Sequence, residues 1–176
     1  EMQRLQTIID PEIGIVTYIG EAHAKGFSSK DEKINEKLSL FINSKLLIYN
    51  ADDEQLQQAV VNFKKEKNPA LQLLSISCSE GDILVKAVKK APLRTEIELA
   101  FKGSLQKFSI PFSDDASISN AITCAALLCH LEIKLSDVRP EMESLRSVEM
   151  RMELKDGIND CSVINDSYSA DLNSLA

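Results

Sequence analysis

The sequence predicts an α/β protein with a mostly parallel sheet between flanking helices, three layers in all, and a smaller antiparallel section. Between residues 12 and 78, short apolar runs rich in β-branched residues alternate with stretches of helical periodicity. Residues 82–112 instead alternate apolar and polar side chains, which is typical of antiparallel strands with one wet face. Together these patterns indicate a parallel, right-handed α/β sheet that is followed by antiparallel strands.

The first half of the chain supports this class element by element. Asp10-Pro11 ends the first helix, and Ser28 or Ser29 caps the second, with Asp31 and Glu32 in its first turn. We expect residues 12–19 to be buried on both faces, as parallel strands are. In order, the predicted elements are a helix at 1–9, a strand at 12–19, a helix from 28 or 29 to 43, a strand at 46–49, a helix at 54–67 and a strand at 71–78.

The second half begins with the alternating strands, which turn at Ala91-Pro92 and at residues 102–104. A strongly apolar helix is expected over 114–131, capped near Ser113–Asp115, and a second over 136–145. Residues 146–157 are expected to form a polar connector that ends in a Gly157 turn. A last strand is predicted at 161–166.

Composition narrows the possible functions. The 176 residues are 44% hydrophobic and 27% charged, and the net charge of −7 disfavours a general binder of nucleic acid or anionic membranes. No apolar run approaches the ~20 residues of a membrane span, and a cytoplasmic location is expected. Glu1 lies directly in an amphipathic stretch, which predicts a piece of a longer protein. The four cysteines lack metal-site spacing and are expected to be buried free thiols: Cys78, Cys124, Cys129 and Cys161.

Polar side chains gather where predicted strands end. Because ligands of α/β sheets bind at the carboxyl ends of strands, such groups suit a phosphate, a nucleotide or Mg²⁺. The other interpretation is that Asn, Asp and Gly populate loops in any protein. The sequence contains no glycine-rich phosphate loop of the GxxxxGK[ST] or GxGxxG type. The residues concerned are Glu21 and His23, then Asn50, Asp52 and Asp53, then Asn165 and Asp166.

The exact residues around these strand ends favour a ligand site over ordinary loop composition. Residues 11–23, Pro-Glu-Ile-Gly-Ile-Val-Thr-Tyr-Ile-Gly-Glu-Ala-His, resemble the P-x-I-G-I-x-T-N-I-G-x-A-H segment of the ATP-dependent Mur ligases of peptidoglycan synthesis. Further stretches resemble the same family in the same order, so the resemblance extends over essentially the whole chain. They are Glu36-Lys37-Leu38, Ser117-Ile118-Ser119-Asn120-Ala121, and Arg151-Met152-Glu153 followed by Ile164-Asn165-Asp166-Ser167-Tyr168-Ser169-Ala170.

The resemblance implies a set of site residues. His23 matches a histidine that binds Mg²⁺, and Lys37 matches a lysine that becomes carbamylated and helps to hold that metal. A bare ammonium would repel Mg²⁺, whereas a carbamate is an oxygen ligand. Asn120 matches an adenine-contacting asparagine, Arg151 an arginine near the phosphates, and Asp166 a carboxylate on the ribose hydroxyls. His23, Lys37 and Arg151 are therefore the expected catalytic residues.

The resemblance also implies an activity and an organisation. Asp166-Ser167-Tyr168 is similar to the branch that uses ATP and Mg²⁺ to join D-Ala-D-Ala to UDP-MurNAc-tripeptide through an acyl phosphate. Residues 1–147 would be the C-terminal portion of the ATP-binding central domain. Residues 148–176 would be a connector and the first strand of a Rossmann-like C-terminal ligase domain. The phosphate loop and a metal-binding glutamate are expected upstream, in domains that partner this stretch, so the stretch alone is expected to be inactive.

Departures from the family pattern leave alternatives open. Tyr18 stands where the family usually has Asn, Ala116-Ser117 replace His-Asn, and Asn165 replaces Asp. One alternative is another Mur or folylpolyglutamate-type ligase that uses a different amine. The second is a non-catalytic, degenerate ligase module that supports a fused alanine racemase, because residues 27–34 resemble racemase-fused versions.

Overall fold

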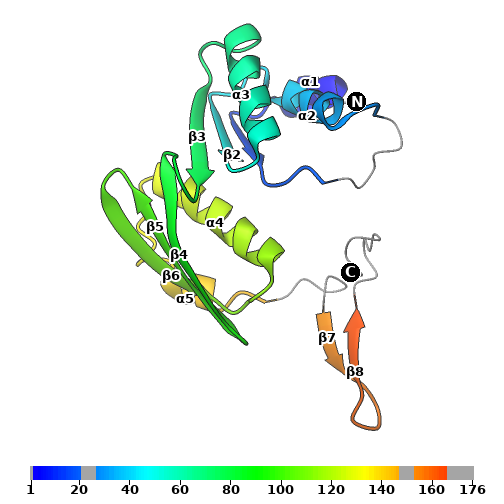
Figure 1. The fold of residues 1–176 in the computed structure, drawn as a ribbon, viewed down its shortest axis with the longest axis vertical. Coiled ribbons are helices and arrows are strands. Elements are labelled where there is room, and N and C mark those ends of the chain that lie inside the picture. The colour runs from blue at the N-terminus through cyan, green and yellow to red at the C-terminus, as the bar shows by residue number, and fades with distance from the viewer. Residues whose placement is uncertain (1, 21–26, 147–152, 166–176) are drawn as a thin grey trace. The chain divides into compact units, whose positions relative to one another are not determined.

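The computed structural model describes residues 2–20, 27–146 and 153–165 (Figure 1). The chain divides into two compact units, Glu1–Glu143 and Ser144–Ala176. Each unit has its own sheet.

The first unit is built on a six-stranded sheet with the order β1-β2-β3-β4-β5-β6 (Figure 1). The first three neighbour pairs along this order are parallel and the last two are antiparallel. This mixed sheet confirms the predicted α/β class with an antiparallel section. The strands are β1 (Ile13–Val16), β2 (Leu46–Asn50), β3 (Gln72–Ser77), β4 (Ile83–Ala91), β5 (Arg94–Phe101) and β6 (Ser104–Ile110).

Helices cover both faces of this sheet. Leu47 and Tyr49 of β2 pack in one apolar cluster with residues of α2 and α3, whereas Leu46 and Ile48 pack in another with residues of α4. Since successive strand residues point to opposite faces, α4 lies on the face opposite to α2 and α3. The helices are α1 (Met2–Ile9), α2 (Lys30–Leu38) with a 3₁₀ turn at Ser39–Phe41, α3 (Glu54–Glu66), α4 (Asp115–His130) and α5 (Arg139–Glu143).

Strand β1 differs from its prediction. It is shorter than residues 12–19, and it alternates between exposed and buried positions instead of being buried throughout. Ile13 and Ile15 are each 38% exposed, because β1 is the edge of the described sheet and only its other face is covered. On the covered face, a Cβ at Gly14 would lie 2.5 Å from the Phe41 ring, so the close packing of Phe41 requires glycine there.

A short loop links the parallel part to the antiparallel part. Strands β3 and β4 pair in parallel only at Ile76–Ile83 and Ser77–Leu84. Asp82 stabilises this turn, because its carboxylate accepts hydrogen bonds from the Ser75 amide at 2.9 Å and the Ser75 hydroxyl at 2.7 Å. The chain then enters the antiparallel strands without a crossover helix.

The antiparallel part follows the predicted alternation. Strand β5 alternates exposed and buried residues along most of its length, and β4 contains an irregularity between Val85 and Ala87. Lys102 and Gly103 both have positive φ, of 48° and 76°, as a two-residue hairpin turn of type I′ requires. The turn predicted at residues 102–104 is therefore confirmed.

Other expectations needed correction. Helix α5 is shorter than the predicted helix at 136–145, and β7 (Glu153–Asp156) occupies part of the predicted polar connector. β7 pairs antiparallel with β8 (Ser162–Asn165) and forms the small sheet of the second unit. The thiols are free as expected but not buried: three are exposed and Cys129 is half-buried. Within the described ranges, no helix is both long enough and apolar enough to cross a membrane.

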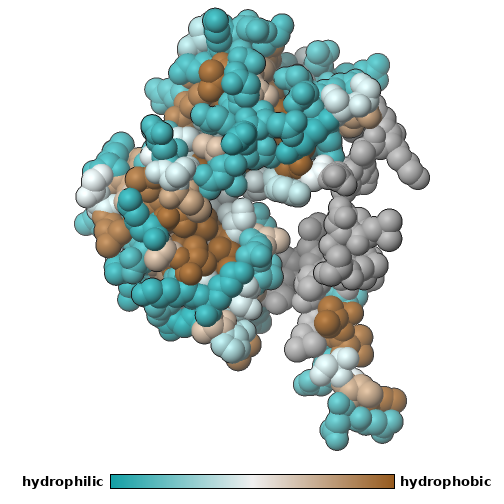
Figure 2. All heavy atoms as spheres, in the orientation of Figure 1, coloured by the Kyte–Doolittle hydropathy of each residue, from teal (hydrophilic) through white to brown (hydrophobic). Residues whose placement is uncertain are grey.

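Surface character differs between the two faces of the first unit. Helix α3 carries hydrophilic residues on its outer side, whereas α4 is apolar in almost every turn. Figure 2 shows hydrophilic side chains over most of α2 and α3 and an apolar area around α4. Leu131, just after α4, is half exposed. Asn120 is exposed on this helix.

Candidate functional site

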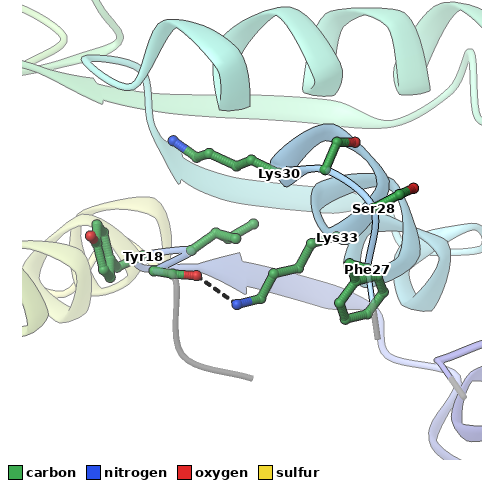
Figure 3. Close-up of a pocket in the computed structure, with 8 residues that line it drawn as sticks. Tyr18, Phe27, Ser28, Lys30 and Lys33 are labelled. Carbon is green, nitrogen blue, oxygen red and sulfur yellow. Dashed lines mark hydrogen bonds between the residues drawn. The ribbon is translucent and has the colours of Figure 1, made fainter. Parts of the chain in front are cut away.

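A cavity of about 410 Å³ opens at the carboxyl end of β1. This is the end of a parallel sheet at which ligands of α/β proteins bind. Its lining comes from the segment that leaves β1 and from the start of α2 (Figure 3). The lining residues are Tyr18, Ile19, Gly20, Phe27, Ser28, Ser29, Lys30 and Lys33.

The N-terminus of α2 forms one wall of this cavity. The Ser29 hydroxyl caps the helix by accepting the Glu32 amide at 3.1 Å, as the sequence predicted for Ser28 or Ser29. The Glu32 carboxylate reaches back and accepts the Ser28 hydroxyl at 2.5 Å and the Ser28 amide at 2.7 Å. These two hydrogen bonds hold the pKa of Glu32 below its ordinary value. The result is a reciprocally capped helix start with a defined position at the cavity.

Two lysines of α2 line the cavity and reach in different directions (Figure 3). The Lys30 Nζ lies 2.9 Å from a carboxylate oxygen of Asp53, which caps α3. Lys33 is only 7% exposed, and its Nζ donates a hydrogen bond to the Gly20 carbonyl oxygen at 2.5 Å. Lys33 thus links α2 to Gly20, four residues after the end of β1.

A second group of polar residues follows β2. The Asp52 carboxylate accepts the Ser77 hydroxyl at 2.6 Å and the Cys78 amide at 3.0 Å, and so joins the ends of β2 and β3. Burial by itself raises the pKa of Asp52, but these hydrogen bonds outweigh it and the pKa is lowered. Asn50 accepts the Asp52 amide at 3.0 Å. These hydrogen bonds stabilise the loops at the ends of β2 and β3.

The structure describes only part of the predicted site. Lys37 is exposed in the last turn of α2, and it does not line the cavity. Asn120 is exposed on α4, on the opposite face of the sheet, so the two side chains are not brought together in this unit. His23, with the neighbouring Glu21, and Arg151 and Asp166 lie outside the described residues.

Lys33, Lys30 and Tyr18 were not predicted as site residues. The sequence offered one signal for Lys33: it directly precedes Ile34, which together with Leu38 marks the buried side of α2. A wide apolar stripe on a helix includes the positions that flank it. Tyr18, 78% exposed, had been noted only as a departure from the family pattern.

Among the residues that the structure describes, no group of three or more His, Cys, Asp or Glu side chains could hold a metal ion. Of the two expected metal ligands, Lys37 is the described one, and its exposure leaves the amine accessible to carbamylation. In its unmodified, charged form Lys37 does not fit a cation site, whereas the carbamate form does.

Comparison with known proteins identifies the family. Residues 1–128 match the model of the Mur ligase middle domain. The chain is 25% identical over 99% of its length to the UDP-N-acetylmuramoyl-tripeptide–D-alanyl-D-alanine ligase of Bacillus subtilis, of which it covers 37%. It is also 25% identical, over 94% of its length, to the UDP-N-acetylmuramoylalanine–D-glutamate ligase of Prochlorococcus marinus, of which it covers 34%.

A solved structure shares the fold. The Thermotoga maritima MurF ligase in complex with ADP matches with a TM-score of 0.74 and 18% identity, over 98% of this chain and 39% of that one. The chain therefore spans less than two fifths of the length of these relatives. The match of the middle-domain model over most of the first unit shows that this chain belongs to the Mur ligase family.

Proposed function

We propose that this chain is part of a cytoplasmic, ATP-dependent ligase that joins D-Ala-D-Ala to UDP-MurNAc-tripeptide. The observation that carries the proposal is the similarity to the Bacillus subtilis ligase named for this reaction, which extends over 99% of the chain. The Asp166-Ser167-Tyr168 sequence, similar to that branch of the family, supports the same substrate pair. The fold shared with a ligase bound to ADP supports a nucleotide substrate.

In the proposed reaction, the tripeptide carboxylate attacks the γ-phosphate of ATP, which forms an acyl phosphate and releases ADP. The amine of D-Ala-D-Ala then displaces phosphate through a tetrahedral intermediate. Catalysis of this kind depends mainly on positioning and on neutralising charge. Asn120 would contact the adenine, Asp166 the ribose hydroxyls, and Arg151 would steady the transferred phosphoryl group.

His23 and carbamylated Lys37 would hold a Mg²⁺ ion, which would offset the negative charge of the phosphates when bound. Carbamylation exchanges a positive amine for an anionic oxygen donor, and this change makes Lys37 a suitable ligand. The position of Lys37 on the capped helix α2 supports this role, because the helix fixes the base of its side chain.

The test is phosphate release by the full-length protein with ATP, Mg²⁺ and UDP-MurNAc-tripeptide, with different amines added in turn. We expect release only with D-Ala-D-Ala. Lys37→Ala should abolish release, and short carboxylic acids should restore part of it by replacing the carbamate. Lys65→Ala, which changes an exposed lysine of α3, is the matched control and should behave as wild type. The 176-residue chain alone should release none.

A second candidate has its own support. The D-glutamate ligase of Prochlorococcus marinus is as similar in sequence as the D-Ala-D-Ala ligase, at 25% identity. Release with a single amino acid on a shorter muramoyl precursor would assign the chain to that part of the family. If a folded full-length protein released no phosphate with any amine, ligase activity would be contradicted. That result would favour a non-catalytic module that supports a fused racemase.

A further inference from the structure

Helix α2 carries three lysines in three different environments. Lys30 pairs with Asp53 at 2.9 Å, and Lys37 is exposed near the end of the helix. Lys33 lies between them and is buried, with its amine at the cavity beside β1. Lysine is almost never fully buried without a polar partner, because removing an ammonium group from water costs free energy. The burial of Lys33 therefore needs an explanation.

The packing of α2 fixes where Lys33 can reach. Ile34 and Leu38 are completely buried against the sheet, so the helix cannot rotate without exposing them. From this fixed helix the Lys33 side chain extends to the end of β1, where its Nζ lies 2.5 Å from the Gly20 carbonyl oxygen (Figure 3). Ile19, the preceding residue, is also buried. Gly20 thus follows a residue packed in the apolar cluster and is bonded to α2 through Lys33.

We propose that Lys33 is a positioning residue of the ligase reaction, which holds the Gly20 carbonyl and so fixes the start of the segment that bears His23. This inference rests on the proposed function. His23 follows Gly20 by only three residues along the chain, so on this proposal a shift at Gly20 would displace the expected metal ligand. Lys37, one helical turn after Lys33, is expected to serve the same metal. Helix α2 would then control both ligands, one directly and one through Lys33.

This role differs from that of an ordinary core residue. A side chain that only fills space would be replaced without loss by a methionine, which has nearly the same length and shape but no charge and no donor. A residue that positions metal ligands affects the metal and the rate instead, typically by about 10–100-fold when it is removed. The requirement for Mg²⁺ therefore separates the two roles.

The experiment compares wild type, Lys33→Met, Lys33→Arg and the exposed-surface control Lys65→Met in the full-length protein. Phosphate release is measured against Mg²⁺ and ATP concentration, and amide hydrogen exchange is measured on peptides that span residues 18–27. For Lys33→Met we expect kcat to fall about tenfold or more and the Mg²⁺ concentration for half-maximal rate to rise by a similar factor. KM for ATP should change less than about twofold, and exchange should accelerate in residues 18–27. Lys33→Arg, which keeps charge and donors, should recover part of the rate.

The inference would be overturned if Lys33→Met had the same kcat and Mg²⁺ dependence as the wild-type protein. It would also be overturned if amide exchange became faster in Lys33→Met while the Mg²⁺ dependence stayed the same. Uniformly faster exchange throughout the protein would mark Lys33→Met as unfolded. Lys33→Leu, which like methionine has neither a charge nor a donor, then takes its place under the same criteria. An inactive wild-type protein would instead contradict the proposed function, so the two failures are distinct.

Discussion

The parallel part of the sheet (β1–β3) and the antiparallel part (β4–β6) bury their residues differently. In β2, Leu46 to Tyr49 are all buried, because helices cover both faces of this strand. In β5, exposed and buried residues alternate, since one face packs in the α4 cluster and the other is open to solvent. The parallel part therefore leaves little room for polar groups except at the ends of its strands.

The polar interactions follow the same division. At the ends of the parallel strands, Lys33 contacts Gly20 and Asp52 joins β2 to β3. In the antiparallel part, charges pair across neighbouring strands on the wet face, as Lys107 and Glu98 do at 2.7 Å. Exposed ion pairs of this kind contribute about 0–1 kcal/mol to the stability of the folded protein. The cavity beside β1 therefore lies in the parallel part, whereas Lys107 and Glu98 of the antiparallel part pair with each other across strands.

The largest expected effect comes from truncating the doubly covered strand. Ile48→Ala should lower the free energy of unfolding by about 2–5 kcal/mol, because Ile48 is fully buried and leaves a cavity. Val88→Ala, on the antiparallel strand β4 with 38% of its side chain exposed, should cost less than about 1 kcal/mol. Urea denaturation of the chain measures both. Equal losses would contradict the division between the two parts.

Replacing either of two glycines by alanine should lower the free energy of unfolding by about 1–3 kcal/mol, for a different reason in each case. Gly14→Ala in β1 places a methyl group against the Phe41 ring, whereas Gly103→Ala forces a positive φ in the β5–β6 turn. A second substitution, Phe41→Leu, should recover part of the loss in Gly14→Ala and none in Gly103→Ala. Thermal unfolding of the singles and doubles tests this, and additive losses in both pairs would refute the crowding at Gly14.

The smallest expected difference is between two helix caps. Asp53→Ala and Asp114→Ala each remove a cap, on α3 and α4, and should each cost about 0.5–2 kcal/mol. Asp53→Ala should cost somewhat more, since it also removes the partner of Lys30.

The Asp53 cap should also be visible in the pH dependence. Burial by itself raises the pKa of Asp53. Hydrogen bonds from Lys30 and the α3 amides outweigh this effect and bring the pKa below its ordinary value. Its contribution to stability is therefore complete above the unfolded pKa of roughly 3.9 and is lost as the pH falls through the lower folded pKa. Asp53→Asn should flatten this acid loss in urea denaturation between about pH 5 and pH 2. An unchanged slope would show that Asp53 does not contribute.

The amino-acid sequence by itself determined the α/β class, the order of the elements in the first unit, a cap at Ser28 or Ser29 and the turn at residues 102–104. These depend on local periodicity, capping and turn residues, which act over a few neighbours along the chain. The family resemblance was equally readable, because its motifs are contiguous stretches such as residues 11–23.

Only the tertiary structure decided which residues meet. That β1 is the edge of the sheet formed by the described residues, with Ile13 and Ile15 exposed, follows from sheet order, which no local pattern encodes. The burial of Lys33 and its hydrogen bond to Gly20, thirteen residues earlier, depend on how α2 packs across the sheet. Sequence patterns indicate which apolar side chains prefer burial. Long-range packing determines which neighbouring polar side chain is buried along with those apolar residues.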